Sequence, residues 1–280
     1  MPKIICWMMQ IFTPETLNGF YGYPKLNPVG LSYQKIFKVD FKPRPLEDTV
    51  RELREANMLV AVPALDNDVL YGTSTPASWV RDLVAEYPDV FIGFSGADPN
   101  KGYDAVKDLE RDVKEYDFRA LYLQPMESGV PIDDRRHYPL YTRACDLDIP
   151  VFVACSVHYN NRVPLDVQSP YRVDQVAVDF PDLKIVLRHA LFPWIWEIAA
   201  VMMRHPNMYM EISSFRHKYI HPEWIRYIDS MFPDRTVYGL GHPFSTPKQN
   251  IEEFGEVPLK PETKNKILYE TSPKLLRFES

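Results

Sequence analysis

The sequence lacks the features typical of nucleic-acid-binding, membrane-spanning and disulfide-stapled proteins. A net charge of -6 and a pI near 5.7 leave no basic excess to neutralise phosphates. The first ten residues show no signal-peptide pattern, and no apolar run reaches membrane-spanning length. The three cysteines, at positions 6, 145 and 155, are too few and too irregular for a disulfide framework or a zinc motif. These absences predict a soluble, cytoplasmic protein with reduced thiols and no nucleic-acid or membrane partner.

Several catalytic motifs are also missing. The chain has no phosphate-binding glycine loop, no Gly-x-Ser-x-Gly nucleophile elbow, no HExxH helix and no dinucleotide fingerprint, so no organic cofactor is indicated. We also find no internal repeat, low-complexity run or interdomain linker. With 280 residues and 45% hydrophobic content, residues 1–280 are predicted to form a single domain with a sizeable core.

Short β-branched runs alternate with amphipathic stretches along the whole chain, which is the pattern of repeated βα units. The predicted strands are Ile4–Ile11, Leu59–Ala64, Val90–Phe94, Arg119–Leu123, Val151–Cys155, Lys184–Arg188, Met208–Ile212 and Thr236–Leu240. The predicted helices are Leu46–Ala56, Pro76–Tyr87, Gly102–Tyr116, Tyr138–Leu147, Arg172–Asp179, Ile195–Arg204, Pro222–Met231 and Pro247–Phe254. Eight such units predict an α/β fold, a (β/α)8 TIM barrel. The tail 261–278 is predicted to be a closing helix that breaks at Pro273.

Two connections are longer than usual, residues 13–45 after the first strand and residues 158–170 after the fifth. Long loops in compact domains are commonly binding loops or lids, and both leave the end of the barrel where active sites lie. The first contains the aromatic run Phe20, Tyr21 and Tyr23. These rings could cover an aromatic or polyunsaturated ligand, or they could pack on the barrel rim.

Short motifs follow one another in order over nearly the whole length of the chain: 39–41 with 45–49, 91–94 with 97–99, 180–186, His189 with 193–194 and 197, 206–209, and 238–239 with 242–243. In these motifs the chain resembles the amidohydrolase-related TIM-barrel proteins of the aminocarboxymuconate semialdehyde decarboxylase type. The resemblance implies a distorted eight-stranded barrel. Members are typically zinc-dependent hydrolases or nonoxidative decarboxylases of small carboxylic acids, and dimers are common among them.

The resemblance also identifies a departure from the family. The paired histidines of the first strand fall on Met8 and Gln10, the histidine of the fifth strand falls on Ala154, and the catalytic aspartate falls on Gly241. His189 is retained. Since catalytic zinc needs three His, Cys or carboxylate ligands, this divergent member is predicted to bind no metal. A set made of Cys6, Cys155 and His189 is the alternative.

Three residues are candidate acids or bases. His189 closes the sixth strand and could act in catalysis, or it could be a hydrogen-bonded structural residue. His242 follows the lost aspartate in a glycine-containing turn and could replace it, or lie at the surface. Glu211 on the seventh strand could be an acid or base, or part of a buried ion pair.

Five further residues are candidate substrate contacts. Tyr122 and Gln124 share one face of the fourth strand and could bind substrate oxygens, although Tyr122 could also fill the core. His158 lies in the loop after the fifth strand, and Trp194 could form a pocket wall or pack on the rim. Arg216 could clamp a carboxylate or be a solvated loop charge. Strand alternation places Arg188 opposite His189, in an ion pair behind the barrel.

Three functions fit this sequence. The first is a metal-independent enzyme that hydrolyses a lactone or other activated acyl group of a small organic acid. The second is a nonoxidative decarboxylase or other lyase. The third is a noncatalytic ligand-binding barrel, because a fold does not establish an activity. The remaining polar residues at the strand ends favour an enzyme, and a homodimer is compatible with the resemblance.

Overall fold

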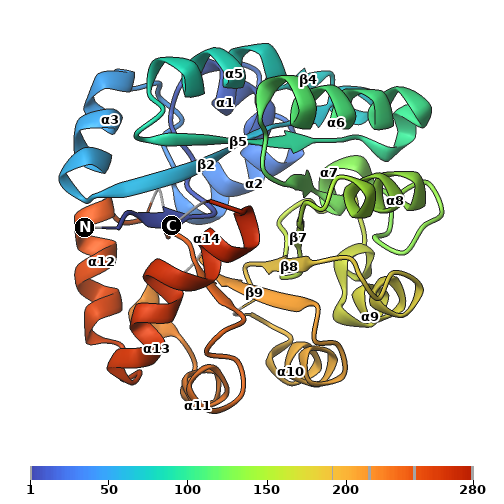
Figure 1. The fold of residues 1–280 in the computed structure, drawn as a ribbon. Helices are drawn as coiled ribbons and strands as arrows, with labels where there is room; N and C mark the ends of the chain where they lie inside the picture. The colour runs from blue at the N-terminus through green and yellow to red at the C-terminus, as the bar shows by residue number, and fades with distance from the viewer. Residues whose placement is uncertain (1, 191, 214–215, 242–243, 279–280) are drawn as a thin grey trace.

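The computed structural model describes residues 2–190, 192–213, 216–241 and 244–278. Its main sheet has eight parallel strands in the order in which they occur along the chain (Figure 1). These strands are β1 (Ile4–Cys6), β2 (Met58–Ala64), β5 (Phe91–Gly96), β6 (Leu121–Leu123), β7 (Val151–Ala154), β8 (Ile185–Arg188), β9 (Met208–Ile212) and β10 (Thr236–Tyr238). A separate two-stranded ribbon pairs β3 (Asp66–Asn67) with β4 (Thr73–Ser74). The predicted (β/α)8 architecture is confirmed.

Main-chain hydrogen bonds between the first and last strands close the barrel. The N–H of Trp7 donates to the carbonyl of Tyr238 at 3.0 Å, and the N–H of Leu240 donates to the carbonyl of Met8 at 2.9 Å. The prediction that the first strand extends to Ile11 was wrong, because its ladder with β2 ends at Cys6. Beyond that point the chain bonds to the other neighbour and then leaves the barrel.

The eight predicted helices are all present, with ends within a few residues of those predicted. The larger set of helical segments includes short turns between the units: α1 (Pro14–Tyr21), α2 (Pro28–Phe37), α3 (Leu46–Glu55), α4 (Asp68–Tyr71), α5 (Ala77–Glu86), α6 (Tyr103–Tyr116), α7 (Pro125–Ser128), α8 (Tyr138–Asp146), α9 (Pro170–Asp179), α10 (Ile195–Arg204), α11 (Pro222–Ser230), α12 (Pro247–Glu256), α13 (Pro261–Asn265) and α14 (Thr271–Leu276). Proline in the first turn of several of these helices fixes φ near its helical value and gives up an N–H that has no helical partner.

The long segment after β1 is not a loop, because α1 and α2 occupy most of it. Thr13 caps α1 in a reciprocal capping box with Thr16, and the side chain of Asn27 caps α2 by accepting the N–H of Gly30 at 2.9 Å. Gly22 ends α1 in the left-handed conformation. These capping signals were present in the sequence and identify two short helices.

The tail does not break at Pro273. A π-helical segment, Lys266–Glu270, joins α13 to α14 and provides a wider turn before the proline. Pro273 therefore lies in the first turn of α14, where its missing N–H is least costly.

The core has two layers, which follow from the period-two alternation of each strand. The inner layer fills the barrel and includes Trp7, Phe94, Tyr122 and Phe152, whose rings meet edge to face. The outer layer lies between the strands and the surrounding helices. Both layers are buried, which explains why the strands are almost continuously apolar.

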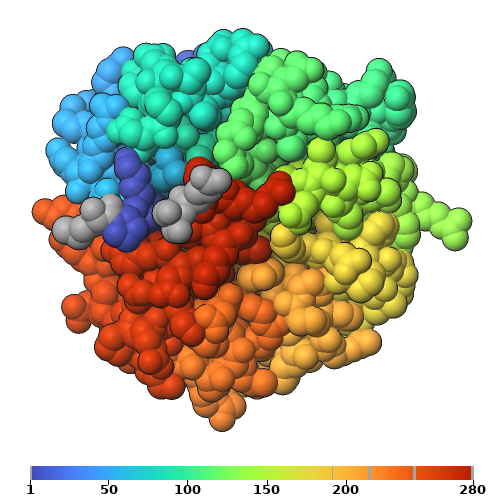
Figure 2. All heavy atoms as spheres, in the orientation of Figure 1, coloured from blue at the N-terminus to red at the C-terminus, as the bar shows by residue number. Residues whose placement is uncertain are grey.

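The tail covers the end of the barrel at which the strands begin. In α14, Leu275 and Leu276 join the inner core layer, and Ser272 accepts a hydrogen bond from the indole N–H of Trp7 at 2.8 Å. Figure 1 shows α14 across the middle of this face, and Figure 2 shows its atoms covering the centre. The opposite end, where the strands exit, is the end available for a site.

Candidate active site

The side chain of Arg188 lies at the centre of the strand-exit end. It is only 3% exposed, and its Nη1 donates to the hydroxyl of Tyr122 and, at 3.0 Å, to Oε1 of Gln124. The expectation that Arg188 lies behind the barrel was wrong. Along β8, Val186 belongs to the inner layer, so Arg188 also points inward, and His189 then turns with a left-handed φ of 59°. That turn brings both side chains into one hydrogen-bonded cluster.

The hydrogen bonds of His189 define its tautomer. Its Nε2 lies 2.8 Å from Nε of Arg188, and because a guanidinium only donates, Nε2 must accept. Nδ1 therefore carries the hydrogen and lies 2.6 Å from the hydroxyl of Ser213. Burial and the positive charge of Arg188 hold the pKa of His189 well below its ordinary value. The imidazole is neutral in this network.

Glu211 projects from the inner face of β9 and supports this arrangement. Its Oε2 accepts the backbone N–H of His189 at 3.0 Å and the hydroxyl of Ser213 at 2.8 Å. Burial raises the pKa of the carboxyl to about 7. A Cβ on Gly239 would lie 1.5 Å from Oε1, so glycine is required there to make room for the carboxyl. The hydrogen bond to Oε2 stabilises the left-handed backbone of His189.

Glu127 is a second buried carboxyl that the sequence analysis missed. It lies in α7, the short helix that leaves β6 directly after Gln124. Neither carboxyl oxygen has a hydrogen-bond partner within the described ranges. Burial raises the pKa of Glu127 to about 8, although the nearby charge of Arg188 acts in the opposite direction. The sequence did offer one signal for this residue, because Glu127 is an acidic residue three positions after Gln124, the polar residue that directly follows the strand.

Arg188 has no acidic counter-ion. No carboxylate in the described part of the chain lies within ion-pair distance of its guanidinium, and its Nη2 makes no hydrogen bond there. A buried charge is costly unless it is paired, and here the partners of the guanidinium are a phenol, an amide and a neutral imidazole. The barrel mouth therefore carries an uncompensated positive charge suited to an anion.

Aromatic side chains from α1 and α2 lie over this mouth. The hydroxyl of Tyr21 donates to Oε1 of Gln10, and the Tyr21 ring lies 5.4 Å from that of Tyr33. Tyr33 in turn packs edge to face on Tyr159, from the loop after β7, at 5.4 Å. Burial raises the pKa of Tyr33 to about 12, with Arg188 partly opposing the effect. Of the aromatic run in the first long segment, Phe20 and Tyr21 are buried in the inner core layer and Tyr23 packs against it.

Three further predicted residues make their contacts outside the Arg188 cluster. His158 places Nε2 3.1 Å from the carbonyl of Pro164, within its own loop. Trp194 precedes α10 and packs on the outer core layer, and Arg216 forms an ion pair with Glu253 of α12. His242 lies outside the described residues. The structure therefore brings together Tyr122, Gln124, His189 and Glu211, and adds Arg188 and Glu127.

The side chains that the resemblance places at the family's metal positions do not fit a catalytic zinc ion. Met8 offers a thioether and Gln10 an amide, and both ring nitrogens of His189 are already hydrogen-bonded. The alternative cysteine set fails because Cys6 and Cys155 belong to the outer core layer. Across residues 2–190, 192–213, 216–241 and 244–278, no group of three His, Cys, Asp or Glu side chains is arranged to hold a metal.

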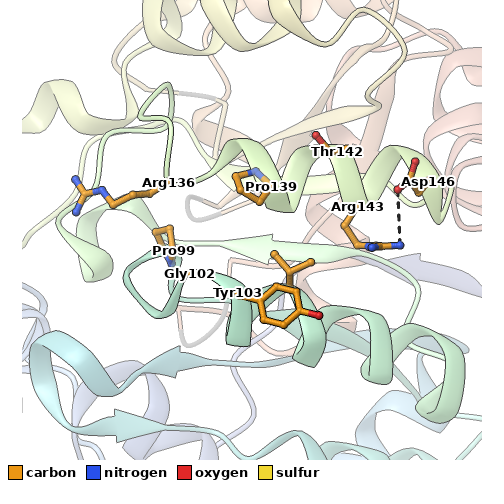
Figure 3. A pocket seen from close by; sticks show the side chains of 9 residues that line it. Pro99, Gly102, Tyr103, Arg136, Pro139, Thr142, Arg143 and Asp146 are labelled. Carbon is orange, nitrogen blue, oxygen red and sulfur yellow. Dashed lines mark ion pairs between the residues drawn. The ribbon is translucent and has the colours of Figure 1, made fainter.

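A surface groove of about 400 Å³ lies outside the barrel, between α6 and α8 (Figure 3). Its walls include Tyr103, Arg136 and Arg143, the last of which lies 3.7 Å from Asp146. None of the predicted site residues that the structure describes lines it. We also find, among the described residues, no helix long and apolar enough to cross a membrane.

A closed parallel barrel with polar groups gathered where its strands exit is the arrangement of a TIM-barrel enzyme. The chain belongs to the amidohydrolase family, because the sequence profile of that family matches residues 38–278. This confirms the resemblance drawn from the sequence.

Similar proteins include both solved structures and one curated enzyme. A TIM-barrel protein from Bordetella bronchiseptica is 27% identical, with a TM-score of 0.82 and 98% of each chain covered. The 5-carboxyvanillate decarboxylase of Sphingomonas paucimobilis shares the fold at 12% identity and a TM-score of 0.74, with 100% of both chains covered. The 2-keto-4-carboxy-3-hexenedioate hydratase of Sphingobium sp. is 23% identical over 209 residues, a match that spans 59% of this chain and 61% of the hydratase.

Proposed function

We propose that the protein is a nonoxidative decarboxylase of a small aromatic or unsaturated carboxylic acid, and that it works without a catalytic metal. The observation that carries the proposal is the buried guanidinium of Arg188, which has no acidic counter-ion among the residues that the structure describes. The aromatic rings over the mouth suit a flat, conjugated substrate. The names of the similar decarboxylase and hydratase support a lyase acting on an organic acid.

Arg188 would stabilise the charge that develops during loss of CO2. When the bond to the carboxyl carbon breaks, its electron pair enters the conjugated system and negative charge accumulates on a substrate oxygen. A fixed cation in a water-poor site stabilises such charge without having to reorganise. Tyr122 and Gln124 hold the guanidinium from one side, which leaves Nη2 free to contact that oxygen.

Hydrolysis of an activated acyl group is the second candidate function, and Glu211 is the observation that favours it. A carboxyl with a pKa of about 7 is matched to neutral pH as a general base for water. Turnover in ¹⁸O-labelled water separates the two reactions, because hydrolysis places solvent oxygen in the acid product. Decarboxylation releases CO2 and exchanges a carbon–carbon bond for a carbon–hydrogen bond.

The test combines ligand binding with CO2 release. Calorimetry would measure the affinity for 5-carboxyvanillate and 2,6-dihydroxybenzoate, and CO2 release would be followed with chelator present and after metal analysis. In Arg188→Met, affinity should fall at least about 100-fold, since charge-assisted hydrogen bonds contribute about 1.5–3 kcal/mol each. The control Arg136→Met removes an arginine from the surface groove and should bind normally.

Three results would contradict the proposal. Equal affinity in Arg188→Met and the wild type would remove the anion site. CO2 release that is abolished by chelator and restored by stoichiometric zinc would overturn the metal-free mechanism. Tight binding with no conversion of any tested acid would instead support the ligand-binding barrel.

A further inference from the structure

We propose that Glu127 is the acid that gives a proton to the substrate carbon from which CO2 departs. This assignment rests on the proposed decarboxylase function. It adds a catalytic residue to a site in which the sequence pointed to His189, His242 and Glu211.

The backbone around Glu127 is held firmly at the barrel mouth. Its N–H donates to the carbonyl of Gln124 at 2.9 Å, and Gly129 closes the turn by donating to Pro125 at 2.9 Å. The side-chain amide of Asn160, from the loop after β7, donates to the carbonyl of Met126 at 2.7 Å. Two segments of the barrel mouth thus fix the position of this short helix, as expected where a group must be presented accurately.

The surroundings of the carboxyl favour its neutral form. The charged or titratable groups that face it are Arg188 at the end of β8, Tyr122 of β6, Tyr33 of α2 and Tyr71 of α4. Of these groups, Arg188 alone carries a charge at neutral pH. Because neither oxygen of Glu127 has a hydrogen-bond partner among the described residues, an anion there would be poorly stabilised.

The pKa of Glu127, raised to about 8 by burial, agrees with this geometry. A group that is protonated at neutral pH and titrates close to it is suited to general acid catalysis. A purely structural carboxyl would be expected to satisfy its oxygens with donors, as the buried Asp112 does with Ser95 and Arg111. Glu127 instead keeps its acidic hydrogen available to a ligand bound beside Arg188.

The proposed step is balanced without an oxidant or reductant. The O–H bond of Glu127 breaks as a C–H bond forms at the carbon that bears the carboxylate, and the conjugated system supplies the electron pair for that bond. The bond to the carboxylate carbon then breaks, CO2 leaves, and its electron pair restores the conjugated system, with negative charge on the oxygen that faces Arg188. The resulting Glu127 carboxylate takes a proton from water, which restores the acid for the next turnover.

Glu127→Gln tests the assignment, because glutamine keeps the shape and removes the acidic proton. CO2 release should fall at least about 100-fold, within the range typical of a lost general acid. Affinity for 2,6-dihydroxybenzoate should stay within about threefold, because Arg188 is retained. In the wild type, kcat should decline as the pH rises past about 8, and this decline should be absent from the residual activity of the variant.

The matched control is Glu52→Gln. It changes a carboxyl on α3 that forms an ion pair with Arg44, and it should leave CO2 release unchanged. Infrared difference spectroscopy gives a readout that needs no turnover. At pH 6 the spectrum of the wild type should contain the C=O band of a protonated carboxylic acid. In Glu127→Gln the part of this band that comes from Glu127 should be missing.

The possible failures are distinguishable. Unchanged CO2 release in Glu127→Gln, or an infrared spectrum at pH 6 without a Glu127 acid band, would overturn the role of Glu127 while leaving the decarboxylase proposal intact. Absence of CO2 release from the wild type on every acid tested would overturn the proposed function itself, whatever the infrared result.

Discussion

Replacing Glu127 with glutamine should stabilise the folded protein, and the stabilisation should grow as the pH rises. The carboxyl has a pKa of about 8 when folded, against 4.5 for the free side chain. Between these values the unfolded chain releases the proton and the folded chain retains it. Since stability falls with pH wherever the folded state binds more protons, Glu127 costs the wild type stability throughout this interval.

The magnitude follows from the two pKa values. Each pH unit between 4.5 and 8 removes about 1.4 kcal/mol from the free energy of unfolding, so by pH 7 the accumulated cost is about 3 kcal/mol. Glutamine has no proton to lose and escapes this cost. At pH 5 the variant should therefore be more stable than the wild type by less than about 1 kcal/mol, and at pH 7 by about 3 kcal/mol.

Urea unfolding followed by tryptophan fluorescence at pH 5, 6, 7 and 8 would measure the difference. Glu52→Gln serves as the control, because its partly exposed ion pair with Arg44 contributes at most about 1 kcal/mol. A stability difference that does not change with pH, or a less stable Glu127→Gln at pH 7, would refute the reasoning. Either result would mean that Glu127 is ionised or paired in the folded protein. The expected result, higher stability with lower turnover, is typical of a strained catalytic group.

Two further predictions concern glycine and cysteine positions. Gly239→Ala should lower the free energy of unfolding by at least about 2 kcal/mol, because its Cβ would collide with Oε1 of Glu211, whereas Gly255→Ala, with nothing within 4 Å, should raise it by up to about 1 kcal/mol. Urea unfolding compares the two, and equal effects would contradict the assigned role of Gly239. A thiol reagent should label at most Cys145 in the native protein and all three cysteines in urea, because Cys6 and Cys155 are buried and burial raises their thiol pKa. Labelling of more than one thiol in the native protein would show that the barrel wall opens.

The predicted strands and helices were accurate because barrel strands are buried on both faces and helices on one. Burial on both faces gives the strands short apolar runs, and burial on one face gives the helices amphipathic stretches. Local sequence alone therefore shows the alternation of strands and helices. The assignment of the family's metal positions to Met8, Gln10 and Ala154 stays a prediction, because it rests on residue identity at the expected strand positions. The helices α1 and α2 were missed, although Thr13 and Asn27 supplied their capping signals.

The site was only partly predictable. Strand alternation correctly paired Tyr122 with Gln124, but it assigned Arg188 to the wrong side because His189 does not continue the strand. The left-handed turn at His189 depends on Glu211, which is 22 residues away and accepts its N–H. Similarly, nothing local to Glu127 shows that its oxygens are buried without partners.

The sequence by itself therefore determined the barrel and its family, because these depend on periodicity and residue type. The tertiary structure decided which side chains share the barrel mouth: Arg188, which has no acidic counter-ion among the described residues, and Glu127 and Glu211 as buried acids close to it. Burial and electrostatic environment arise from residues that are distant in sequence, and these determine both the charge of the pocket and the protonation of its carboxyls.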